Sequence, residues 1–148
     1  MVKDVLIFES EVFSFEPPLS ERGLPYDLPL GDDIAAFLKQ RLETQGVAWK
    51  IDDPVREDFG IVLMLERGKD VFTVTVSWQG EHSWALVFSQ MRGCLGWLFN
   101  TKSAAEPLRE IKLLVNDVVF GEIERFRNPR WIAEDEFPGV AQNFVIPK

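Results

Sequence analysis

Histidine and cysteine, which often serve as catalytic base and nucleophile, each occur once in this sequence. A serine or cysteine nucleophile needs a base beside it, and histidine most often fills that role. His82 lies next to Glu81 in a predicted hairpin turn, and the sequence identifies no partner for it. Cys94 lies in an apolar run whose nearest basic neighbour is Arg92, which favours a buried, inert thiol. We therefore expect a structural or exposed histidine and no catalytic residue.

Carboxylate pairs are the next candidates for chemistry, because neighbouring acids can share a proton or bind a metal ion. Asp52 and Asp53 precede Pro54, which is typical of a turn. Glu57 and Asp58 would point to opposite faces of an extended chain, so they cannot form a catalytic dyad. A metal site built from distant acids stays an alternative, but no calcium loop, zinc ligand set or phosphate-binding glycine loop is present. We expect neither metal nor cofactor, and we interpret these four acids as candidates for binding a partner.

Aromatic side chains are numerous, with 5 Trp and 12 Phe. Trp78 and Trp84 bracket a predicted hairpin, so cross-strand packing explains them. Trp97, Phe99 and Trp131 lie in segments without a clear period. Large rings in such segments either fill the edge of the core or anchor a partner, and both interpretations are kept for these three.

The motif Glu57-Asp58-Phe59-Gly60 places a glycine at the start of a predicted strand, where we expect a β-bulge. This motif and the stretch Gly31 to Leu42 resemble small uncharacterised bacterial single-domain proteins, over roughly residues 24 to 120. In those proteins a strand and an amphipathic helix precede a β-meander and a final helix. Some acidic bacterial proteins of similar size are immunity proteins that block a toxin, and the resemblance implies that class of function.

Two helices are predicted to position these residues. Ile34, Leu38 and Leu42 recur at helical spacing between Asp32 and Gln45, with Gly46 as the stop. Asp32 and Asp33 are expected to cap this helix. A capping box at Ser103 and Glu106 is expected to open a second amphipathic helix that ends near Gly121.

The strands are predicted from alternating and β-branched runs. Three of them, joined by turn-like segments, form the pattern of an antiparallel meander. One sheet face there is strongly apolar, whereas the other, which includes Val62, Met64, Thr75 and Val87, is small and mildly apolar. A C-terminal segment or another subunit is expected to cover that second face. The predicted strands are Val2 to Phe8, Phe59 to Glu66, Val71 to Trp78 and Ser83 to Ser89, with Trp49 to Ile51 and Met91 to Asn100 as additional candidates.

Together these elements predict an α+β fold, with an antiparallel sheet of four or five strands and both helices packed on one face. The chain of 148 residues fits a single domain, 1–148. Residues 127–148 contain Pro129, Pro138 and Pro147 together with large apolar side chains. We expect them to form an irregular strap over the body.

Charge limits the classes of partner. The net charge is −8, and residues 1–60 hold 13 acidic and 6 basic side chains. This excess repels nucleic-acid phosphates and anionic lipid, so we expect no nucleic-acid and no membrane partner. No signal peptide or membrane-spanning run is predicted, and the lone cysteine cannot form a disulfide within the chain. We expect a cytoplasmic protein.

Three functions fit these patterns. The first is a non-catalytic acidic protein that binds a basic protein partner, such as a bacterial toxin that it neutralises. The second is an accessory protein that forms a homodimer or larger homo-oligomer through the second sheet face. The third is an enzyme or small-ligand binder with a pocket lined by Trp84, Trp97 and Trp131 and by acids such as Glu57 and Asp58. The partner-binding residues expected for the first function are Glu57, Asp58, Asp52, Asp53, Trp97, Phe99 and Trp131.

Overall fold

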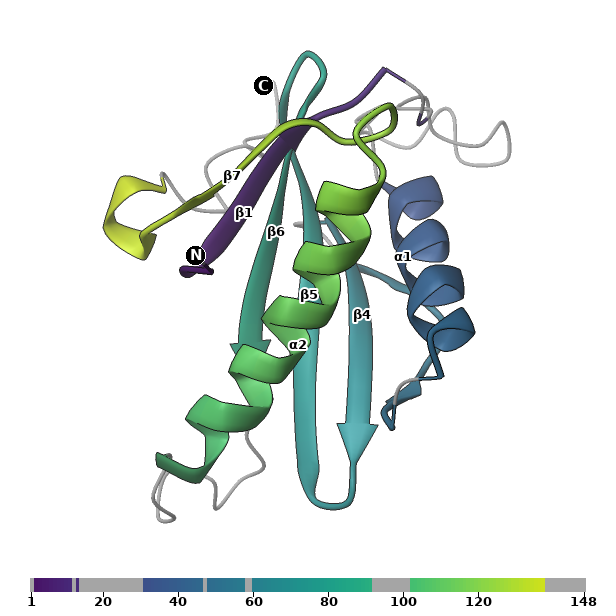
Figure 1. Cartoon of the computed structure of the whole chain (residues 1–148), viewed down its shortest axis with the longest axis vertical. Helices are drawn as coiled ribbons and strands as arrows, with labels where there is room; N and C mark the ends of the chain where they lie inside the picture. The colour runs from purple at the N-terminus through teal and green to yellow at the C-terminus, as the bar shows by residue number, and fades with distance from the viewer. Residues whose placement is uncertain are drawn as a thin grey trace.

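The computed structural model describes residues 2–11, 13, 31–46, 48–57, 60–91 and 102–137, and every structural statement below concerns these residues. Two helices, seven strands and one short 3₁₀ turn follow one another along the chain (Figure 1). Their order is β1 (Val5–Glu9), α1 (Asp32–Thr44), β2 (Lys50–Ile51), β3 (Val55–Glu57), β4 (Gly60–Arg67), β5 (Asp70–Gly80), β6 (Ser83–Gln90), α2 (Lys102–Gly121), β7 (Arg127–Ile132) and η3 (Glu134–Glu136).

The strands form one antiparallel sheet in the order β2-β4-β5-β6-β1-β7. The remaining strand, β3, pairs with β4 on the side away from β5. The predicted α+β class is confirmed, with helices packed against an antiparallel sheet. The expected count of four or five strands is wrong because two short strands line the outer side of β4 and a seventh strand follows α2.

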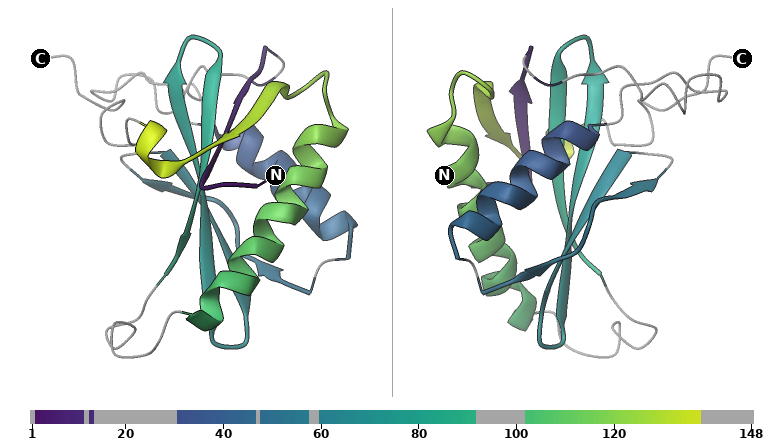
Figure 2. Two further views of the ribbon diagram at one scale, coloured as in Figure 1. Left: turned by 60° about the vertical axis from the view of Figure 1, so that its left-hand side comes forward. Right: turned by 90° about the vertical axis from the view of Figure 1, so that its right-hand side faces the viewer.

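The core lies between the sheet and both helices, which cover the same face (Figure 2). Alternate residues of the central strands, such as Leu63 and Val74, point into this core and are at most 1% exposed. Each helix has the apolar stripe that its residue spacing predicted. Packing against the sheet buries this stripe. The buried helix residues are Ile34, Ala35, Leu38, Leu42, Ile111, Val115, Val118 and Val119.

The start of α1 differs from the sequence prediction. Gly31 is the N-cap residue, with φ +88° and no side-chain cap hydrogen bond, so Asp32 and Asp33 do not occupy the capping position that was predicted for them. These two acids lie in the first turn instead, where they face the positive end of the helix dipole. A Cβ atom at Gly31 would lie 2.7 Å from Cγ1 of Val76, so the close approach of α1 to β5 requires glycine there. The predicted end is confirmed, since α1 stops at Thr44 and Gly46 has φ +68°.

The start of α2 also differs. Lys102 is already helical, so Ser103 lies inside the helix and the predicted capping box does not open it. Pro107 is the sixth residue of the helix, beyond its first turn, so α2 lacks the backbone hydrogen bond that an N–H at this position would donate one turn back. The predicted end at Gly121 is confirmed. Neither described helix is long and apolar enough to cross a membrane.

The segment after α2 is more regular than predicted. Residues 127–132 form β7, which pairs with β1, so the expectation of an irregular strap is wrong for this part. The strand is at the edge of the sheet, and its register with β1 shifts between Arg130 and Arg127, two features that accommodate Pro129 within a strand. Residues 138–148, the rest of the predicted strap, lie outside the described residues, as do residues 92–100 of the predicted strand at Met91 to Asn100.

Candidate functional site

Three of the four acids singled out by the sequence, Asp52, Asp53 and Glu57, lie near α1, along the outer side of β4. We call this surface the acidic edge. It is formed by the charged side chains of α1 other than Arg41, which pairs with Glu122 after α2, together with those of the β2–β3 segment and one β4 residue. Seven are acidic and three are basic, so the acidic edge has a net charge of −4. Its members are Asp32, Asp33, Lys39, Glu43, Lys50, Asp52, Asp53, Arg56, Glu57 and Glu66.

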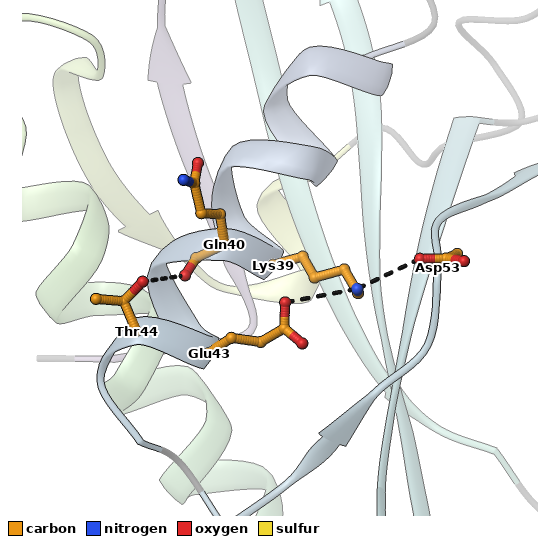
Figure 3. A network of polar contacts seen from close by, with 5 residues as sticks. All are labelled: Lys39, Gln40, Glu43, Thr44 and Asp53. Atoms are coloured by element: carbon orange, nitrogen blue, oxygen red, sulfur yellow. Dashed lines mark hydrogen bonds and ion pairs between the residues drawn. The ribbon is translucent and has the colours of Figure 1, made fainter.

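Lys39 connects α1 to the segment before β3 (Figure 3). Its Nζ lies 3.3 Å from Oδ1 of Asp53 and 3.5 Å from Oε1 of Glu43, one helical turn further along. The hydrogen bond to Asp53 is the main reason why the pKa of Lys39 is raised above its ordinary value of 10.5, and the charges of both acids add to it. Although it is paired, the Asp53 side chain remains 95% exposed. Its free oxygen therefore faces solvent beside the helix.

A second ion pair also joins α1 to this part of the chain, with the acid on the helix and the base on β3. Arg56 of β3 donates from Nη2 to Oδ2 of Asp32 on α1, at 3.0 Å. Lys50 of β2 lies 3.7 Å from Asp52 and 3.8 Å from Glu66. All three bases of the acidic edge are thus paired with its own acids, and the acids of this edge still outnumber the bases by four.

Glu57 is exposed on β3 and has no ion-pair partner among the described residues. It pairs directly with Gly60 of β4, and the neighbouring pairs continue in the same register. The predicted bulge is therefore wrong. Gly60 has φ +146°, and a Cβ atom there would collide with the carbonyl oxygen of Val76. The approach of the β5 backbone explains the glycine of the Glu57-to-Gly60 motif; Asp58 and Phe59 lie outside the described residues.

Trp131 lies away from the acidic edge, on β7 at the other side of the sheet. It is 9% exposed, packs against Phe88 with ring centroids 5.4 Å apart, and donates from Nε1 to Oδ1 of Asn116 at 2.9 Å. Of the two roles considered for its ring, the structure supports core packing. Trp97 and Phe99 lie outside the described residues.

The structure thus brings Asp52, Asp53 and Glu57 of the predicted set to one edge. Sequence reasoning did not include the α1 residues that complete this edge. The spacing of Lys39 and Glu43, four residues apart, was a signal of a charged helix face. Their connection to Asp53 depends on the packing of α1 beside β4, which no local pattern specifies.

Among the residues that the structure describes, the candidate metal-binding groups do not converge. His82 is in the β5–β6 turn, as predicted, where its carbonyl oxygen accepts a hydrogen bond from Ser10 N at 2.9 Å. Cys94 lies outside the described residues. Within the described ranges, no three His, Cys, Asp or Glu side chains are placed to hold a metal ion. Trp84, one of the tryptophans considered for a ligand pocket, is fully buried.

The chain matches no family model, no curated protein and no solved structure. Function is inferred below from the charge, exposure and packing of the described residues.

Proposed function

We propose that this chain is a non-catalytic binding protein whose acidic edge binds a basic protein partner, and that this partner is a bacterial toxin that the chain neutralises. The observation that carries the proposal is the excess of seven acidic over three basic side chains among the ten residues of the acidic edge. The class of partner is taken from the resemblance to small acidic bacterial proteins. The acidic edge itself supports a partner with an exposed group of lysine or arginine side chains.

Several carboxylates of this edge are accessible to such a partner. The side chains of Asp53 and Glu43 are 95% and 52% exposed, and Glu57 is exposed on β3. Exposed carboxylates keep their hydration until a partner arrives and attract cations over a long range. An electrostatic surface of this kind raises association rates by roughly 10- to 1,000-fold.

The acidic edge is also held in place before any partner binds. The Lys39–Asp53 and Arg56–Asp32 pairs join α1 to the β2–β3 segment at two points. Each exposed pair contributes little stability on its own, about 0–1 kcal/mol. Their effect is to limit the orientations of the carboxylates, which lowers the entropy lost on binding.

The test is capture of a partner from an extract of the native host at low salt, followed by measurement of association rates. The Debye length falls from about 30 Å at 0.01 M salt to about 10 Å at 0.1 M, so the rate should decrease steeply over this range. The variant D53K/E57K should associate more slowly. The matched control E134K/D135K changes two exposed acids of η3, away from the acidic edge, and should have a much smaller effect. Capture of no basic protein, or equal effects of both variants, would contradict the proposal.

A second candidate, a homo-oligomeric accessory protein, is favoured by the face of the sheet opposite the helices. One row of paired residues crosses six strands there without a charged side chain: Val55, Val62, Thr75, Val87, Val5 and Ile132. Val55 of this row is 48% exposed and Val62, Val87 and Ile132 are partly exposed, whereas Val5 and Thr75 are already buried. A row without carboxylates is where two copies of an acidic protein would repel each other least. Light scattering at high concentration tests this, and a monomeric mass would exclude it.

A further inference from the structure

Helix α2 has two apolar faces, of which the fold uses only one. Ile111, Val115 and Val118 lie in the core and are at most 4% exposed. At 3.6 residues per turn, Leu113 lies about 200° around the helix from both Ile111 and Val115, so it points away from the sheet. Phe120 is seven residues further along and lies on the same side as Leu113. Both are 42% exposed.

We call this surface the outer face of α2, and it continues into the turn after the helix. Ile123, in that turn, is 67% exposed. Three of the five exposed large apolar side chains of the described residues thus lie on this helix and its following turn. In Figure 1 α2 lies in front of the sheet, and no described segment crosses its outer side.

The charged side chains beside these apolar residues are not neutralised. Glu106, Asp117 and Glu124 are exposed and have no ion-pair partner among the described residues, and the same holds for Arg109. By contrast, Glu110 and Glu122 on the flanks pair with Arg67 and Arg41. Among the side chains that the structure describes, the outer face therefore combines apolar residues with three unpaired acids and one unpaired base, and the partly exposed Lys112 lies on its flank.

From this combination we infer that the outer face of α2 docks an amphipathic helix of a partner protein, with lysine or arginine beside its apolar stripe. Leu113 and Phe120 are one heptad apart, about 10.5 Å along the axis, which matches the spacing of apolar residues on a second helix. The unpaired acids select a basic partner helix. This surface is separate from the acidic edge, so the inference adds a second contact to the proposed function.

The probe is a synthetic helical peptide made only of leucine and lysine, with leucines at heptad spacing, titrated calorimetrically at low salt. The wild-type chain should bind it, and a peptide with glutamate in place of lysine should not bind. The variant L113S/F120S should weaken binding at least about tenfold. The matched control V55S/M91S removes the two other exposed large apolar side chains, which are 48% and 51% exposed, and should retain wild-type affinity.

Charge variants locate the peptide independently. D117K/E124K, on the outer face, should weaken binding, whereas D53K/E57K, on the acidic edge, should not. Thermal unfolding of each variant confirms that it folds, as expected for exposed positions. The inference is overturned by a wild-type chain that does not bind, or by V55S/M91S having the same effect as L113S/F120S. It is also overturned if only D53K/E57K abolishes binding, an outcome that leaves the acidic-edge proposal in place.

Discussion

Among the described glycines, Gly60 leaves the least room for a side chain. Its φ of +146° and the carbonyl oxygen of Val76 both exclude a side chain. We expect Gly60→Ala to lower the free energy of unfolding by more than the roughly 1–3 kcal/mol that backbone strain alone costs. Urea denaturation monitored by tryptophan fluorescence measures this loss.

Gly46 provides the matched control for backbone strain. Its φ is +68°, but a Cβ atom there would meet nothing within 4 Å. Gly46→Ala should therefore cost only the roughly 1–2 kcal/mol of a left-handed backbone. Equal losses for the two variants would show that the β5 backbone does not approach Gly60 closely.

Lys39 should give the stability of the chain a dependence on alkaline pH. Its pKa is raised in the folded state by Asp53 and Glu43, so its pairing stabilises the fold fully below the unfolded pKa of about 10.5. That contribution is lost as the pH rises through the folded-state pKa. In melting curves from about pH 8 to 11.5, the difference between the wild type and Lys39→Met should shrink at the alkaline end. A difference that stays constant with pH would exclude this role for the ammonium.

Individual residues of the acidic edge were predictable only in part. Asp52, Asp53 and Glu57 were identified because local carboxylate pairs are visible in the sequence. Asp32 was assigned to capping instead, since a local rule explained it. Its pairing with Arg56, 24 residues later, depends on the position of α1 beside β3.

At the scale of elements, α1 depends on its buried stripe. Leu38 is 0% exposed, and burial of such a side chain contributes about 1.5–3 kcal/mol. Leu38→Asp should remove that contribution and bury an unpaired charge, and the total is large against a typical stability of about 5–15 kcal/mol. We expect loss of the cooperative melting transition. Gln40→Asp, at an exposed position of the same helix, is the control, and an unchanged melting temperature for Leu38→Asp would refute the packing of α1.

Trp131 of β7 donates a hydrogen bond to Asn116 of α2. Its substitution tests whether the ring packs in the core or anchors a partner. Trp131→Phe removes the hydrogen bond to Asn116 and should cost about 0.5–1.5 kcal/mol of stability. Because the ring is in the core, the affinity for a captured partner should not change. A loss of affinity without a loss of stability would identify Trp131 as an anchor after all.

The regular elements were predictable where one face is buried along several residues. Both helices and the β4–β6 meander have such faces, and their periodicity is visible in the sequence. The missed strands lack it. β3 has only three residues, all exposed, and β7 contains Pro129 without an alternating pattern. Pairing with a neighbouring strand, rather than any intrinsic preference, makes these segments extended.

At the scale of the whole molecule, both edges of the sheet carry features that oppose pairing with another sheet. On one edge the outer partner of β4 is divided into two short strands around Pro54. On the other, β7 contains Arg127, Pro129 and Arg130. Prolines, charges and short strands at sheet edges are the usual protection against aggregation.

Pro129→Val restores an N–H group to this edge. We expect the variant to aggregate faster than the wild type near its melting temperature, measured by light scattering, because the edge strand gains a donor for an incoming strand. Val55→Thr, an exposed change on the other edge, serves as the control. Equal aggregation of all three proteins would mean that Pro129 does not protect this edge.

The position of β1 has a consequence for how the chain is made. β1 precedes the other described strands in the chain, yet it lies between β6 and β7, which are synthesised much later. A nascent chain that ends before Arg127 leaves one side of β1 without its strand partner. Closure of this sheet therefore waits until β7 has been synthesised, and such long-range closure is slow.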